Sequence, residues 1–308
     1  MCALFRLAIL RVLLVLACVP PAVAEQPDFL LEEPVAGLFV HQGKSVDIDD
    51  PARADMANIG FIVGRDCVAV IDTGGSVAVG AALRRRIKHQ TALPVRFVIN
   101  THGHFDHALG NAAFLDDHPQ FIGHAQLAAV LGGSEDFFRK NFAEELRGAP
   151  DPGIVLPTRT VKDVLEIDLG GRVLRLRAHA SAHSPADLTV EDVASGTLWT
   201  GDLLFRERLP VLDGSLRGWQ AWMRTSASSI HALVIPGHGP MARSWPEALA
   251  PQEAYLASLE RTVRTAIAEG QFLEDLLVDA PRSAPAGWQT TRPHARNLVR
   301  AWRELEWE

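Results

Sequence analysis

The chain has 308 residues, of which 37 are acidic and 30 are basic, so its formal net charge is −7. Hydrophobic residues make up 47% and charged residues 22%, which excludes a disordered polymer, a collagen-like repeat and a coiled coil. The acidic balance argues against nucleic-acid binding, which needs a basic surface. Histidine is plentiful, at 12 residues, and cysteine is scarce, at 3, so a metal site would be built from imidazole and carboxylate.

The first residues have the layout of a secretory signal peptide. Two arginines accompany an apolar run, Leu7–Ala17, that is too short to span a bilayer, and a small-x-small pattern follows at Ala22–Ala24. We therefore predict that residues 1–24 are removed and that the mature chain is periplasmic or secreted, with no stable membrane insertion. The alternative is lipidation of Cys18, but the residues before it are not the usual small ones.

The mature chain, residues 25–308, is predicted to be a single domain. Removal of the signal peptide leaves Cys67 as the one cysteine, so no internal disulfide can form in the exported chain. Cys67 begins an apolar run and is expected to be a small core residue.

Apolar, β-branched runs in the first half predict strands that alternate with helices. The expected strands are Gly37–His41, Asn58–Val63, Val68–Asp72, Pro94–Asn100 and Gln120–Gly123. The expected helices are Ser76–Gln90, Ala108–Phe114 and Leu127–Gly148.

Predicted strands and helices also follow one another in the second half of the chain. A hairpin is expected over Leu165–Ala178, with its turn at Gly170-Gly171, before strands at Leu188–Val190, Thr197–Leu203 and Leu233–Ile235. Helices are expected at Trp219–His231, Pro251–Gly270 and about Arg292–Leu305, so residues from about 251 to 308 form a C-terminal helical extension. Strands in both halves, each group followed by helices, favour two packed sheets with helices outside.

The strongest chemical motif directly follows an apolar strand and reads H-x-H-x-D-H. His102 and His104 are two residues apart in an extended segment, so they project from one side, and Asp106 and His107 begin the next turn. Four such groups in six residues can hold two metal ions a few ångströms apart. Nitrogen and oxygen ligands without thiolate suit zinc, iron or manganese.

Three further candidate ligands follow, each placed near the end of a strand. They are His183, Asp202 in a Gly-Asp pair, and His238 in a Gly-His-Gly turn. His179 is a rival for His183, but the Ser-Pro context after His183 suits a ligand loop better. Because the proposed ligands come from both halves and must converge on one site, one domain is favoured over two.

In this order the motifs resemble those of the metallo-β-lactamase superfamily of metal-dependent hydrolases. The resemblance runs from about Phe39 to His238 and includes Val70–Gly74, whose Asp supports the metal loop in that superfamily. It implies an α/β fold, the αββα sandwich of two mixed β-sheets with outer helices, with the metals at the edge of the sheets.

A narrower resemblance is to the quinoprotein relay system zinc metallohydrolases of the second type. It rests on segments spread over nearly the whole mature chain: Asn58–Gly64, Asn111–Phe114, Leu198–Phe205, Leu212–Trp219 and Glu304–Glu308. It implies an exported zinc hydrolase of a small molecule, linked to a pyrroloquinoline-quinone-dependent dehydrogenase and cytochrome c. The substrate itself is not implied.

Carried over by motif, the resemblance implies that His102, His104 and His183 bind one metal ion, that Asp106, His107 and His238 bind a second, and that Asp202 bridges both. The ions are expected to be two Zn²⁺, with iron or manganese as alternatives, sharing a water whose pKa falls towards neutrality. Asp106 is expected to orient that water, and Asp72 to fix ligand histidines.

Other functions remain open at this point. Asp202 stands where some lactamases place Cys, which resembles glyoxalase II and makes a β-lactam substrate less expected. A glyoxalase II-like thioesterase, a β-lactamase-like hydrolase and an iron-dependent oxygenase would all share the fold. A non-catalytic metal-binding accessory protein is a further alternative, against which the intact Asp106 and Asp202 argue.

The remaining aromatic and polar residues are assigned mostly to packing. Phe137, Phe138 and Phe142 are expected in the core rather than in a lid, and Asn111 is expected either to touch substrate or to cap a turn. The other residues expected to pack, or to lack a ligand context, are Trp219, Trp222, His118, His124 and His231.

Overall fold

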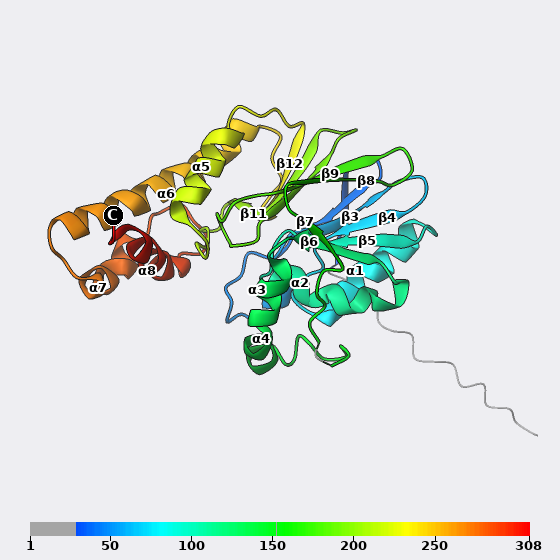
Figure 1. The fold of residues 1–308 in the computed structure, drawn as a ribbon, viewed down its shortest axis with the longest axis horizontal. Coiled ribbons are helices and arrows are strands. Elements are labelled where there is room, and N and C mark those ends of the chain that lie inside the picture. The colour runs from blue at the N-terminus through cyan, green and yellow to red at the C-terminus, as the bar shows by residue number, and fades with distance from the viewer. Residues whose placement is uncertain (1–28, 152) are drawn as a thin grey trace, which may run out of the picture.

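The computed structural model describes residues 29–151 and 153–308, and in them two β-sheets pack face to face with helices outside (Figure 1). This confirms the predicted sandwich of two mixed sheets. The predicted signal peptide, residues 1–24 with Cys18, lies outside the described residues. Within the described part of the chain, no helix has the length and apolar character needed to cross a bilayer.

The first sheet has seven strands in chain order, antiparallel from β1 to β4 and parallel from β4 to β7. They are β1 Glu32–Val35, β2 Leu38–His41, β3 Ile59–Val63, β4 Val68–Ile71, β5 Val95–Ile99, β6 Gln120–His124 and β7 Arg159–Val161. The inner strands match the predicted apolar runs. The edge strands β1 and β7 were not predicted, because they are short and mostly polar or half-exposed.

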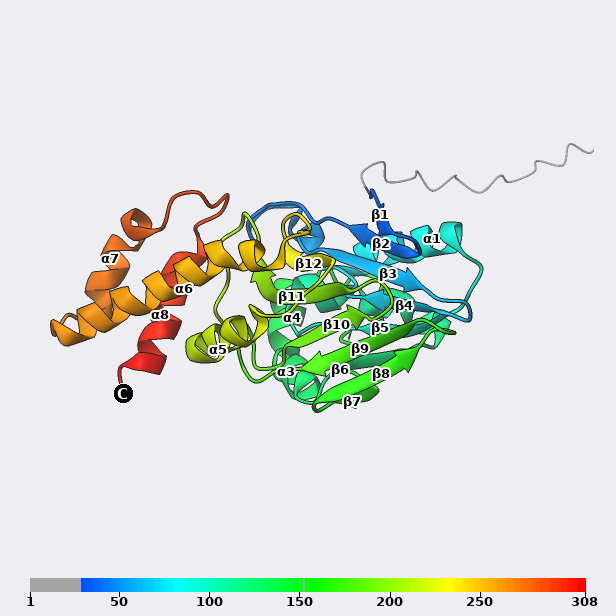
Figure 2. The same ribbon diagram turned by 90° about the horizontal axis from the view of Figure 1, so that it is seen from above.

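The second sheet has five strands in the order β12-β11-β10-β9-β8, and only β11 and β12 run parallel (Figure 2). They are β8 Val164–Asp168, β9 Val173–Ala178, β10 Leu188–Asp192, β11 Thr197–Phe205 and β12 Leu233–His238. Strand β11 is buried along its whole length, which explains its unbroken apolar character. It ends at Phe205, two residues later than predicted, and Asp202 lies within it.

The main core lies between the sheets. Side chains such as Ile62, Leu176 and Trp199 meet there in one cluster of buried residues, which also contains Cys67. Cys67 is 2% exposed, which confirms the prediction of a small core residue.

Helices α1 to α4 and two 3₁₀ helices lie with the first sheet. Ser76 caps the first helix, because its Oγ accepts a hydrogen bond from the Val79 N–H. Their bounds are η1 Arg53–Asp55, α1 Val77–Gln90, α2 Phe105–Ala108, η2 Leu109–Asp117, α3 Leu127–Gly133 and α4 Glu135–Asn141.

Two predicted helices in this layer were wrong in extent. The expected helix at Ala108–Phe114 is a 3₁₀ helix that follows the one-turn α2. The expected long helix at Leu127–Gly148 breaks at Ser134, directly after Gly132-Gly133, and ends at Asn141. Paired glycines weaken a helix, so the break falls where the local propensity is lowest.

Helices α5 and α6 pack against the second sheet, and α7 and α8 lie beyond its edge, where α8 packs on α6 (Figure 2). They are α5 Leu216–Ser226, α6 Trp245–Ala268, α7 Leu273–Ser283 and α8 Pro293–Leu305. α5 begins three residues earlier than predicted because the Ser215 Oγ accepts a hydrogen bond from the Gly218 N–H. α6 begins at Trp245, so Pro251 lies inside it and does not start it, and α7 was not predicted.

Candidate metal centre

Seven predicted ligands converge at one edge of the sandwich, where loops and strand ends of both sheets meet. His102 and His104 lie after β5, and Asp106 and His107 lie in α2, which continues the same loop. We call residues His102–His107 the metal loop. The other three come from the second sheet: His183 from the loop between β9 and β10, Asp202 from β11, and His238 from the end of β12. The structure therefore brings together residues separated by more than a hundred positions.

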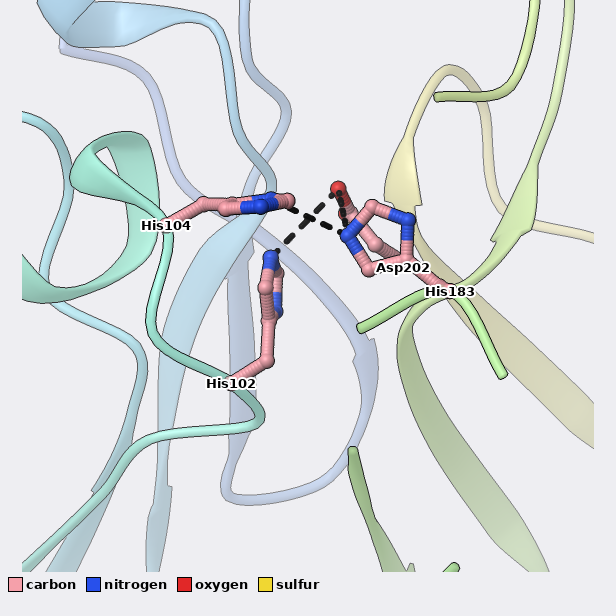
Figure 3. A group of neighbouring side chains, drawn as sticks. All are labelled: His102, His104, His183 and Asp202. Carbon is pink, nitrogen blue, oxygen red and sulfur yellow. Dashed lines mark hydrogen bonds and ion pairs between the residues drawn. The ribbon is translucent and has the colours of Figure 1, made fainter. Parts of the chain in front are cut away.

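The first group of side chains is shown in Figure 3: His102, His104, His183 and Asp202. One ligand atom from each residue lies within 4.8 Å of the others. Asp202 Oδ2 is 3.6 Å from His102 Nε2 and 3.4 Å from His183 Nε2. His104 Nδ1 faces His183 Nε2 at 3.0 Å.

The second group contains Asp106, His107 and His238. Asp106 Oδ2 is 3.3 Å from His238 Nε2 and 3.7 Å from His107 Nε2. The other oxygen of Asp202, Oδ1, is 3.1 Å from His107 Nε2 and 3.4 Å from His238 Nε2. Asp202 thus presents one oxygen to each group, as a bridging ligand would.

Two glycines allow Asp202 to reach this position. Gly201 has a positive φ of 52°, and a Cβ there would lie 2.5 Å from Thr101 Oγ1. A Cβ at Gly237 would collide with the Asp202 carboxylate itself. The Gly-Asp and Gly-His motifs therefore contain glycine because the two strands and the metal loop approach each other closely.

Asp72 lies beneath the metal loop and orients two of its histidines. Its Oδ2 accepts hydrogen bonds from His107 Nδ1 at 2.8 Å and from Thr101 Oγ1 at 2.7 Å, while Oδ1 accepts from the Thr101 N–H at 2.8 Å. Because the Thr101 hydroxyl donates to Asp72, it accepts from His102 Nδ1 at 3.1 Å. Both imidazoles are thereby turned with Nε2 towards the site, the geometry in which an outer carboxylate supports a metal ligand.

Backbone carbonyls orient two more histidines. His183 Nδ1 donates to the Val211 carbonyl at 2.7 Å, and His238 Nδ1 donates to the Met56 carbonyl at 2.8 Å. A carbonyl can only accept a hydrogen bond, so Nδ1 carries the proton and Nε2 presents a lone pair to the site.

His104 is turned the opposite way by a residue that sequence analysis did not identify. Its Nε2 donates to Asp213 Oδ2 at 3.1 Å, so Nδ1 faces the site. Asp213 Oδ1 in turn accepts a hydrogen bond from Arg296 Nη2 at 2.6 Å, which links α8 to the metal loop. Hydrogen bonding to His104 and the charge of Arg296 hold the pKa of Asp213 well below its usual range. Asp213 belongs to the Leu-Asp-Gly-Ser segment noted in the sequence, but nothing there assigned it a partner.

The inward-facing atoms fit divalent cations. His102 Nε2, His107 Nε2 and Asp202 Oδ1 are buried and have no hydrogen-bond partner among the described residues. The lone pairs of His104 Nδ1 and His183 Nε2 face each other at 3.0 Å with both protons directed outward. This arrangement is repulsive without a cation between the rings, and the nitrogen and oxygen donors are those of zinc, iron or manganese sites.

The protonation states of the ligands depend on their burial and their neighbours. Burial lowers the pKa of His183 to about 3, so this imidazole is neutral at physiological pH. Burial raises the pKa of Asp106, but the charges of His107 and His238 outweigh it and lower that pKa to about 2. Burial also opposes the charged form of His107, yet Asp202 and Asp72 raise its pKa well above the ordinary value. Protons therefore compete with metal at His107 more than at His183.

A cavity of about 400 Å³ opens onto the site. Asp106, Asp202 and His238 line it from the metal side. Phe137, Phe138 and Phe142 line it as well: Phe138 and Phe142 are buried as predicted for core residues, whereas Phe137 is 56% exposed at its mouth. The prediction of core residues is therefore confirmed for Phe138 and Phe142 and wrong for Phe137.

The family model described as the metallo-beta-lactamase superfamily matches residues 52–264, a span that includes all seven converging side chains. The chain belongs to the metallo-β-lactamase superfamily. A search of curated proteins gave no significant match.

Solved structures of superfamily proteins are similar in fold. TMB-1 is 18% identical, with a TM-score of 0.60, over 75% of this chain and 98% of that one. A metallo-β-lactamase from Pontibacter korlensis is 17% identical, with a TM-score of 0.60, over 74% of this chain and 98% of that one. A double mutant of the sec-alkyl sulfatase PisA1 is 17% identical, with a TM-score of 0.67, over 90% of this chain and 50% of that one. At these identities the likeness establishes the fold alone.

The other polar residues that the sequence singled out lie outside the two ligand groups of this superfamily chain. His179 lies just beyond β9, and its Nε2 is 2.9 Å from Thr189 Oγ1. Asn111 neither lines the cavity nor caps a turn: it is 1% exposed, exchanges hydrogen bonds with Asn100 and accepts one from the Thr73 hydroxyl. Both expectations for Asn111 were therefore wrong, because its amide braces the interior beside the metal loop. The histidines that also lie apart are His118, His124 and His231.

Proposed function

We propose that this chain is a dinuclear metallohydrolase that acts on a small molecule in the cavity beside the metal centre. The observation that carries the proposal is the set of seven side chains that face one another in two groups, with Asp202 shared between them. Three of their buried ligand atoms, on His102, His107 and Asp202, have no hydrogen-bond partner among the described residues. Such a set is far more complete than a single metal-storage site needs. Membership of a superfamily of metal-dependent hydrolases supports the same conclusion.

The residues of the chain have separable roles in this proposal. Two divalent cations would supply Lewis-acid activation of water and stabilisation of developing negative charge. His102, His104 and His183 would hold one ion, His107, His238 and Asp106 the other, and Asp202 would bridge them. The ionised Asp106 carboxylate lines the cavity, so it can accept a hydrogen bond from the attacking water and orient it.

The finer parts of the proposal rest on sequence resemblance. We propose zinc as the metal, export through the predicted signal peptide, and service to a pyrroloquinoline-quinone-dependent dehydrogenase and cytochrome c. Support comes from the nitrogen and oxygen donor set, which zinc accepts, and from the motifs described above.

A panel of ester, thioester, lactone, phosphodiester and sulfate-ester substrates tests the proposal. We expect the metal-loaded mature protein to hydrolyse at least one class, and Asp202→Ala to abolish that activity together with native metal content. His179→Ala is the matched control, since it removes a nearby imidazole outside both groups and should keep activity. A fully metallated wild type that is silent on every class would overturn the hydrolase proposal and favour an accessory metal-binding protein.

A further inference from the structure

Arg208 is a buried cation without a carboxylate partner, on the wall of the cavity that contains the metal ligands. Its side chain lies just after β11 and the residue is 6% exposed. Nη1 donates to the Val46 carbonyl, and Nε has no hydrogen-bond partner among the described residues. A buried guanidinium is costly unless hydrogen bonds and opposite charge satisfy it.

The carboxylates whose charges act on Arg208 do not satisfy its hydrogen-bond donors. Asp106, Asp202 and Asp47 act on Arg208 through their charge, and none of them accepts a hydrogen bond from it. Burial lowers the pKa of Arg208, yet a guanidinium stays protonated in proteins. Asp106 and Asp202 are also the carboxylates of the proposed metal groups, so their charge is compensated when divalent cations are bound.

Two other arginines at the cavity differ from Arg208. Arg292 is paired with Asp49, and Arg296 with Asp213. Their side chains are 57% and 55% exposed, so their charges are both paired and hydrated. Arg208 alone combines burial, a cavity position and free donors among the arginines of this cavity.

The remainder of the cavity is largely apolar. Phe137, Phe138, Phe142 and Ile48 are among the apolar side chains that line it. A ligand that matches both the Arg208 guanidinium and the apolar wall of the cavity has an apolar body and one anionic head group. Carboxylates, sulfates and phosphates all match the planar donor fork of arginine.

We propose that Arg208 is an anion-binding residue and that the substrates are amphiphilic anions, whose acidic head group pairs with Arg208 while the apolar body contacts the phenylalanine wall. This inference rests on the proposed hydrolase function, because it concerns the substrates of that reaction. It adds the substrate class and a residue that determines specificity.

Binding of three eight-carbon probes to the metal-loaded protein tests the inference: octanoate, octyl sulfate and the neutral octanamide. We expect both anions, or the one whose head group matches the natural substrate, to bind wild type at least about tenfold tighter than octanamide by calorimetry, as a charge-assisted hydrogen bond predicts. The tighter anion identifies the head-group chemistry. In Arg208→Gln the preference should disappear while octanamide affinity is unchanged.

The controls distinguish anion binding by Arg208 from anion binding by the metal ions and from a loss of folding. Arg224→Gln, which neutralises an exposed arginine on α5, should keep the full preference. An anion preference that persists in Arg208→Gln would overturn the inference, since the metals would then hold the anion. If Arg208→Gln does not fold, Arg208→Lys decides: we expect a reduced preference, and an unchanged one would contradict the role of the guanidinium fork.

Metal content and hydrolysis are measured on the same preparations. A protein that binds anions through Arg208 but hydrolyses nothing would refute the hydrolase proposal alone. A hydrolase without any anion preference would refute only the role of Arg208.

Discussion

His179 and His183 are four residues apart, yet only His183 lies in one of the two groups of side chains that could hold a metal ion. His183 is fully buried and presents Nε2 to Asp202 and His104, whereas His179 faces Thr189 and the Trp222 ring. We expect His183→Ala to lose the metal of the first group and all hydrolysis, and His179→Ala to keep both. Elemental analysis of the two purified variants checks this. Equal metal loss in both would show that the groups are wrongly assigned.

The predicted ligands could be found from the sequence because their spacing and strand-end positions are local features. Asp213 and Arg208 could not be assigned roles in the same way. Their contacts depend on how the segment between β11 and α5 packs against the metal loop, which is a tertiary property that no short motif encodes. Metal binding by the seven converging residues itself stays a prediction.

Asp187 provides a pH-dependent prediction outside the ligand set. It accepts hydrogen bonds from the Ser184 N–H and from Ser184 Oγ, the latter at 2.6 Å, and burial raises its pKa from 3.8 to about 7. The folded state therefore keeps a proton that the unfolded state loses above about pH 4. This contribution to stability is fully present below pH 4 and is lost as the pH rises through about 7.

We expect Asp187→Asn, which cannot ionise, to flatten the fall in the free energy of unfolding of metal-free protein between about pH 4 and pH 7. Urea denaturation at a series of pH values measures the slope. Superimposable slopes for wild type and variant would contradict the assignment, and Asp163→Asn, at an exposed position, serves as control.

At the scale of elements, helix α8 is tied to the metal loop through Arg296, Asp213 and His104. Arg300 of the same helix donates to the Asp213 and Gly214 carbonyls. The C-terminal extension thus helps to set the orientation of one imidazole, although it contributes no ligand.

We expect Asp213→Asn to weaken metal binding by about tenfold, the lower end of the effect of losing an outer carboxylate, and Arg296→Gln to weaken it less. Competition with a chromophoric chelator measures the affinity. Arg303→Gln, an exposed change on the same helix, should have no effect. Wild-type affinity in Asp213→Asn would show that His104 needs no such support.

Buried helices and strands were predicted more accurately from the sequence than exposed ones. Strands β3, β4, β5 and β10 lie inside the sheets, and β12, at the edge of the second sheet, is buried along its whole length. Their apolar runs were recognised within one to three residues. Helix ends were less predictable, because Pro251 and the capping serine Ser215 act at positions that a periodic pattern does not mark. Helix α7 was missed because only Ala280 in it is buried.

At the scale of the whole molecule, the candidate metal ligands come together where the two sheets meet. The first sheet supplies the loop from His102 to His107, and the second supplies His183, Asp202 and His238. Each half of the chain supplies only part of this set of side chains, and the single domain stays a prediction. The order of motifs in the sequence anticipated this architecture, and the family match and the similar structures confirm it.

The most direct test of the proposed dinuclear metallohydrolase is the metal content of the purified mature protein, measured together with hydrolysis before and after chelation. If the chain is a dinuclear metallohydrolase, we expect about two divalent cations per chain, loss of activity when they are removed, and recovery when they are restored. A protein that is folded and active with no bound divalent cation, or that keeps its activity after complete metal removal, would contradict it.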